Sequence, residues 1–86
     1  MKKLSDRLTN VLHLYGHVES HDPADLRRNI KNGHVANPEA LRSEFSELLA
    51  ASNLPLEEIN RETGEEFETE HEAREWLREF YETAFG

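Results

Sequence analysis

Cysteine is absent from the 86-residue sequence, and proline, glycine and basic residues are all scarce. Without cysteine the chain can form neither disulfides nor thiolate metal sites, so a reducing cytoplasm suits it. No apolar run approaches the roughly 20 residues that a membrane-spanning helix needs. Lys2 and Lys3 give the start a positive charge, but no apolar segment follows them, so we expect no signal peptide. We therefore expect a cytoplasmic protein that does not bind a membrane.

The shortage of basic residues leaves a net charge of -8, from 10 Lys and Arg against 18 Asp and Glu. Residues 1–37 carry six basic against four acidic side chains, whereas residues 38–86 carry four arginines against fourteen glutamates. The second part of the chain should repel phosphate backbones and attract basic proteins. This distribution predicts a protein partner and no binding of nucleic acid.

Apolar residues recur at steps of three and four, and no segment shows the sustained alternation of a β-strand. Ser5 is a suitable cap for a first helix with one apolar stripe: Leu8, Val11, Leu12, Tyr15 and Val18. Asp22 and Pro23 suit the cap and first turn of a second helix, and Gly33 suits its left-handed end.

Asn37 and Pro38 predict the start of a third helix in the same way, and we expect it to end near residues 51–53. A short fourth helix should begin at Pro55 and end at Gly64. These start and stop residues leave only short connections between the helices, which is typical of neighbouring helices in one bundle.

The fifth helix should begin at a capping box formed by Thr69 and Glu72. We expect the last four helices to bury these apolar side chains: Leu26, Ile30, Leu41, Phe45, Leu48, Leu49, Leu56, Ile59, Ala73, Trp76, Leu77, Phe80, Tyr81 and Ala84. The sequence therefore predicts an all-α fold, a small antiparallel bundle of four to five helices that forms a single domain over residues 1–86.

Three histidines, His13, His17 and His21, are spaced four residues apart. On one continuous helix they would stack on one face, and histidine pairs at this spacing can chelate zinc. Asp22 and Pro23 break the helix just beyond them, so the simpler interpretation is a polar face of solvated imidazoles. The three side chains could also form a contact surface, because they flank the apolar stripe.

Features of an enzyme are missing from the sequence. Paired carboxylates could transfer protons, but no glutamate is marked as buried by its neighbours. The chain has no cysteine, and no serine lies in a recognisable nucleophile elbow. We expect a protein without catalytic residues, metal or cofactor.

The densest charge lies between residues 57 and 72, where eight glutamates accompany a single arginine, Arg61. One interpretation is a solubilising surface. The other is a docking surface, since like charges this close together lower stability unless a basic partner offsets them. We expect a basic protein partner to bind at the centre of this run, on Glu58, Glu62, Glu65, Glu66, Glu68 and Glu70.

Residues 45–64 also resemble a helix-turn-helix, with a short turn around Pro55. A polar residue, Asn60, stands in the middle of the second helix, where packing would favour an apolar side chain. That helix is also acidic, whereas a recognition helix should be basic. A DNA-binding regulator therefore remains an alternative to a protein-binding module.

Four patterns follow one another in the second half of the chain: Leu41-x-x-Glu44-Phe45-x-x-Leu48-Leu49, Leu56-x-x-Ile59, Thr63-Gly64-x-x-Phe67 and Trp76-Leu77-x-x-Phe80-Tyr81. In this order, over about half of the chain, they resemble the helical immunity proteins of contact-dependent growth inhibition and related polymorphic toxin systems in bacteria. The resemblance implies a helical protein that neutralises a cognate toxin by one-to-one binding.

Many toxins of this class are nucleases with basic surfaces, and an acidic inhibitor can cover such a surface by mimicking nucleic acid. An acidic mimic that inhibits a different enzyme, such as an anti-CRISPR, would have the same composition and is a second alternative. We expect a monomer or a weak homodimer, with Phe67 as a candidate dimer contact.

Overall fold

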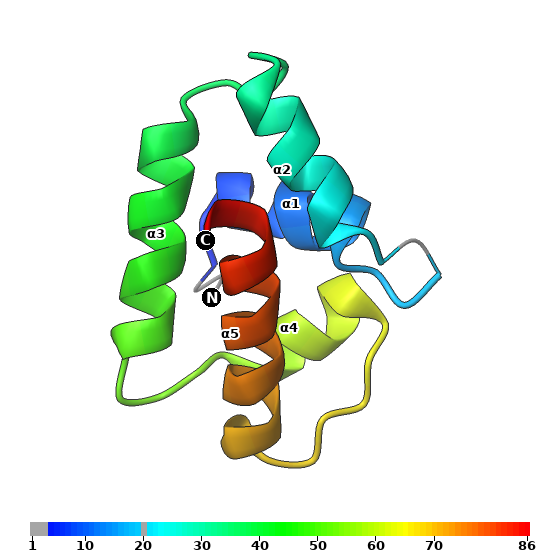
Figure 1. Ribbon diagram of the computed structural model, residues 1–86. Helices are drawn as coiled ribbons and strands as arrows, with labels where there is room; N and C mark the ends of the chain where they lie inside the picture. Colours follow the sequence, from blue (N-terminus) through cyan, green and yellow to red (C-terminus); the bar gives the residue numbers. More distant parts are fainter. Residues whose placement is uncertain (1–3, 20) are drawn as a thin grey trace.

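The computed structural model describes residues 4–19 and 21–86, and this part of the chain contains five α-helices and no strand (Figure 1). They are α1 (Asp6–Tyr15), α2 (Pro23–Lys31), α3 (Pro38–Ala50), α4 (Leu56–Thr63) and α5 (Glu70–Phe85). The expected all-α bundle is confirmed. None of these helices is long and apolar enough to cross a membrane. Lys2 and Lys3, the two basic residues near the start of the sequence, lie outside the described residues.

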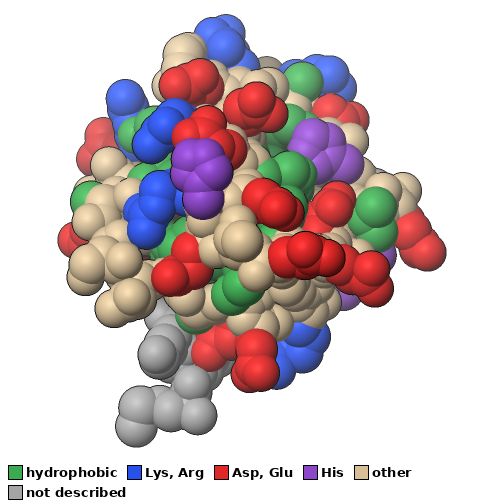
Figure 2. Space-filling model, turned by 90° about the horizontal axis from the view of Figure 1, so that it is seen from below, with side chains coloured by type: hydrophobic (Ala, Val, Ile, Leu, Met, Phe, Trp, Pro, Cys, Tyr) green, Lys and Arg blue, Asp and Glu red, His purple; other side chains and the backbone are tan. Residues whose placement is uncertain are grey.

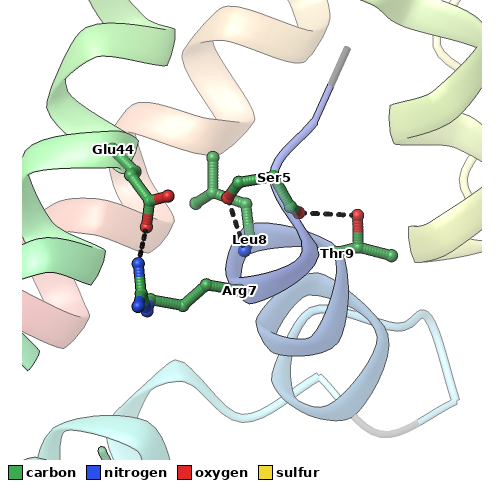
Figure 3. Close-up of polar contacts among 5 residues, drawn as sticks. All are labelled: Ser5, Arg7, Leu8, Thr9 and Glu44. Carbon is green, nitrogen blue, oxygen red and sulfur yellow. Dashed lines mark hydrogen bonds and ion pairs between the residues drawn. The ribbon is translucent and has the colours of Figure 1, made fainter. Parts of the chain in front are cut away.

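Three helices begin at the capping residues expected from the sequence. The side chains of Ser5, Asp22 and Thr69 each accept a hydrogen bond from the backbone N–H three residues further along, and the one at Ser5 is drawn in Figure 3. Each bond satisfies one of the amide donors that a helix N-terminus leaves unpaired. Gly33 and Gly64 adopt the left-handed conformation just after α2 and α4, as predicted.

The start of α3 differs from the prediction. Pro38 occupies the first turn as expected, but Asn37 is left-handed, with φ of 50°, and its side chain makes no capping hydrogen bond. Asparagine tolerates this conformation better than most residues, so here it turns the chain rather than capping the helix. Two further boundaries differ slightly from the prediction: α3 ends at Ala50, and Pro55 flanks α4 instead of starting it.

The first helix is shorter than the apolar stripe implied, because it ends at Tyr15 and leaves Val18 in a loop, 53% exposed. Two backbone bonds hold the loop: the Asp22 amide donates to the Tyr15 carbonyl at 2.8 Å, and the Val18 amide donates to the Thr63 carbonyl at 2.7 Å. The inclusion of Val18 in a helical stripe was therefore wrong. One bond across the loop and one tertiary bond to α4 replace the next turn of helix.

Helix α5 lies in the middle of the molecule and packs against α2, α3 and α4 (Figure 1). Helix α1 packs against the same three helices. The rings of Phe45 and Phe80 stack with their centroids 5.7 Å apart. The buried apolar core consists of Leu4, Leu8, Val11, Leu12, Leu26, Leu41, Phe45, Leu54, Ile59, Ala73, Leu77, Phe80 and Ala84. Each large side chain in it contributes roughly 1.5–3 kcal/mol by leaving water.

Several predicted core residues lie at its edge instead: Ile30, Leu48, Leu49, Leu56, Trp76 and Tyr81 are partly exposed and pack against the buried set. Leu4, Leu54 and Thr63 are buried without having been predicted. The Thr63 hydroxyl remains satisfied, since it donates to the Ile59 carbonyl at 2.7 Å and accepts from the Glu65 amide at 3.2 Å.

Arginine side chains connect helices. Arg7 on α1 forms an ion pair of 2.6 Å with Glu44 on α3 (Figure 3), which is partly exposed and so contributes little to stability. Arg74 on α5 donates to the carbonyls of Leu49 and Ala51 at the end of α3. Because α3 has no basic residue in its own last turn, Arg74 supplies the positive charge that this negative helix end favours.

Gly33 and Gly64 allow a matched test, because their φ angles are 74° and 75°. A β-carbon at Gly33 would meet no atom within 4 Å, whereas one at Gly64 would lie 2.9 Å from Val18 and 3.0 Å from His17. We expect Gly33→Ala to lower the free energy of unfolding by about 1 kcal/mol, through backbone strain alone. Gly64→Ala should lower it by at least about 2 kcal/mol, since the clash adds to the strain. Urea denaturation measures both, and equal losses would refute the packing of the α1–α2 loop on Gly64.

Candidate protein-binding surface

The glutamates singled out in the sequence gather where α4 ends, the chain turns and α5 begins. We call residues 62–72 the acidic turn. It forms one end of the molecule, at the bottom of Figure 1, and acidic side chains spread over the middle of the face seen from that side (Figure 2). A protein with a basic surface would meet this face first.

Two of the six predicted contact residues take part in the fold. Glu58 accepts a hydrogen bond of 2.8 Å from the Leu4 amide, and Glu70 accepts one from the Leu54 amide. Both carboxylates are partly buried. They hold the N-terminal segment and the α3–α4 connection in place, so part of their hydrogen-bonding capacity is used inside the molecule.

The other four differ in how much they present to solvent. Glu62 is only 20% exposed and lies 3.7 Å from the Arg61 guanidinium, and Glu65 is also partly buried. Glu66 and Glu68 are exposed, and their carboxylates make no hydrogen bond or ion pair within the described residues. Among the six predicted contact residues, these two are therefore the charges most available to a partner.

Asn60 fixes the position of the acidic turn. Its side-chain amide donates to the Phe67 carbonyl at 3.1 Å, and its side-chain oxygen accepts from the Phe67 amide at 3.1 Å. Phe67 lies between Glu66 and Glu68, so the clamp on its backbone orders the segment that carries both free carboxylates. Sequence reasoning missed this role, although a polar residue in the middle of an amphipathic helix was a signal for it.

An aromatic cluster borders the acidic turn. The Trp76 ring lies 5.7 Å from Phe67 and 5.6 Å from Phe80 between centroids, and the His21 ring meets it edge-on at 5.5 Å. A cavity of about 170 Å³ opens beside these rings and is also lined by Glu79. Partly exposed tryptophans beside charged residues are typical of the side chains that dominate binding energy in protein interfaces.

The three histidines do not share a helix face, because α1 ends before His17 and His21. His13 and His17 lie with ring centroids 5.9 Å apart, while His21 packs on Trp76. His17 uses its Nδ1 to accept from the Glu19 amide at 3.1 Å. Among the described residues no group of three or more histidines and carboxylates could hold a metal ion.

No protein-family model, curated protein or solved structure matches this chain.

The clamp at Asn60 predicts that an apolar replacement harms the protein, although the position lies on a helix that packs against the core. Asn60→Leu should lower the free energy of unfolding by about 1–3 kcal/mol, because both backbone groups of Phe67 lose their partner. Asn60→Asp keeps an acceptor for the Phe67 amide and should lose less. Hydrogen exchange at that amide should be faster in Asn60→Leu, and unchanged protection would contradict the clamp.

Proposed function

We propose that this protein is an immunity protein that binds a basic bacterial toxin, such as a nuclease, and neutralises it through the acidic turn. The observation that carries the proposal is the presence of Glu66 and Glu68, exposed and without internal partners, on a segment that Asn60 holds in place. A positioned pair of charges forms contacts without first losing the freedom of a mobile loop.

Electrostatics support this assignment. The net charge of -8 gives the molecule a negative field, and the acidic turn concentrates part of it at one end. Such a field accelerates encounter with a basic protein by factors of about 10 to 1,000 at low salt. An inhibitor that must reach a toxin before the toxin acts benefits directly from this acceleration.

The packing of α4 gives no support to the DNA-binding alternative. In a helix-turn-helix the two helices pack against each other, whereas α4 lies mainly on α1 and α5. Its first turn also carries Glu57 and Glu58, where a recognition helix would approach phosphates. An acidic mimic that inhibits a host or defence enzyme shares the same surface, and the identity of the partner separates it from an immunity protein.

The test begins with the tagged protein as bait in a lysate of the source organism. We expect the bait to recover a basic protein in equal amount, and that protein should stop growth when expressed alone and be harmless when the two are expressed together. Recovery of an enzyme that is harmless by itself would favour the mimic. Failure of co-expression to restore growth would refute the proposed function.

Charge reversal then locates the contact. Glu66→Lys/Glu68→Lys should slow association with the recovered toxin by about ten-fold or more at low salt, and should weaken its salt dependence. Glu39→Lys/Glu82→Lys changes the net charge equally at exposed positions on other parts of the molecule, so it is the matched control. Stopped-flow measurements compare the two, and an equal effect of both pairs would mean that overall charge rather than the acidic turn drives binding.

A further inference from the structure

A second cavity lies at the opposite end of α5 from the acidic turn. Its volume is about 260 Å³, and it opens between α2, the start of α3 and the end of α5, which lie side by side in Figure 1. Its apolar wall includes Ile30, Pro38 and Phe85. Three basic side chains also line it: Arg27, Lys31 and Arg42. The combination of an apolar wall with several cations is unusual in a chain with so few basic residues.

The pairing of the basic residues makes this cavity distinctive. Elsewhere in the described part of the chain, the arginines have partners: four form ion pairs with carboxylates, and one donates to backbone carbonyls. These five are Arg7, Arg28, Arg61, Arg78 and Arg74.

The three cations of the cavity have no carboxylate partner. The side chains of Arg27 and Lys31 make no hydrogen bond or ion pair among the described residues, and the Arg42 side chain donates only its Nε, to the Tyr81 hydroxyl at 3.2 Å. One acidic residue, Glu39, also lines the cavity without pairing with them. The chain has eighteen acidic residues, yet these three cations have no carboxylate partner. The cavity therefore carries an excess of positive charge.

We propose that this cavity binds a small organic carboxylate whose body is an aromatic ring or a branched aliphatic group. Guanidinium groups match carboxylates in shape as well as charge, and the apolar wall would remove the body of the ligand from water. The cavity is smaller than the roughly 300–1,000 Å³ of pockets for drug-sized molecules, so a ligand of about one ring fits it best. This site is independent of the proposed binding of a toxin.

A purely structural reason for the three cations is also available, because the end of α5 is the negative end of its macrodipole. That attraction accounts for positive charge near Phe85 but requires no cavity. The two explanations differ in one measurable respect. A structural role changes the stability of the free protein, whereas a binding role changes the affinity for an anion.

The test uses benzoate as the probe, with binding followed by chemical shifts of backbone amides in the ¹⁵N-labelled full chain. We expect saturable binding, with shifts confined to residues around the cavity. Arg27→Gln/Lys31→Gln should weaken it by about ten-fold or more, because the carboxylate loses its charge-assisted hydrogen bonds to both cations. Benzamide, which has the same ring without the charge, and inorganic phosphate, which has charge without the ring, should each bind at least about ten-fold more weakly.

Arg28→Gln is the matched control for Arg27→Gln as a single change. It removes the same charge from the next position of α2, but Arg28 pairs with Asp25 and does not line the cavity. Binding should be unchanged in Arg28→Gln and weakened in Arg27→Gln. The proposal is overturned by an equal loss in both variants, by equal binding of benzamide or phosphate, or by the absence of saturable binding. It is also overturned if Arg27→Gln/Lys31→Gln lowers the melting temperature without changing the affinity for benzoate.

Discussion

Helix α5 is held at the centre of the bundle by a face on which Leu77 and Phe80 are almost completely buried and the Phe80 ring stacks on Phe45. The other features of the molecule depend on this packing. The acidic turn leads into the start of α5, and the apolar cavity with its three cations lies beside the end of α5. Loss of this central contact would therefore disperse both surfaces at once, although neither contains the two buried residues.

The direction of α5 agrees with the charges at its two ends. Glu70 and Glu72 lie in its first turn, where the helix dipole is positive, and the cations of the cavity lie near its last turn, where the dipole is negative. Each favourable interaction of this kind contributes about 0.3–1 kcal/mol. The helix dipole therefore favours the placement of the acidic turn at the start of α5. The basic partner proposed above would offset the repulsion among the glutamates further.

Local signals were sufficient to predict most of the fold. The capping residues Ser5, Asp22 and Thr69 and the left-handed Gly33 and Gly64 act through bonds within a few residues, and all five lie where the sequence predicted them. The errors arose where distant contacts decide the conformation. The first helix stops early because its following loop bonds to the Thr63 carbonyl, which no pattern near residue 18 could reveal.

The candidate site was predictable in place but not in detail. A run of glutamates between two helices must lie on a turn, so its position followed from the sequence. The sequence did not show which glutamates take part in the fold and which are left for a partner. Glu58 and Glu70 accept bonds from Leu4 and Leu54, which are 54 and 16 residues away along the chain. A carboxylate that accepts a bond from a backbone amide keeps its charge but has fewer free lone pairs for a partner. In the proposed complex, the exposed glutamates beside Phe67 would make the electrostatic contacts, and the aromatic cluster next to them would supply specificity for one basic protein among many.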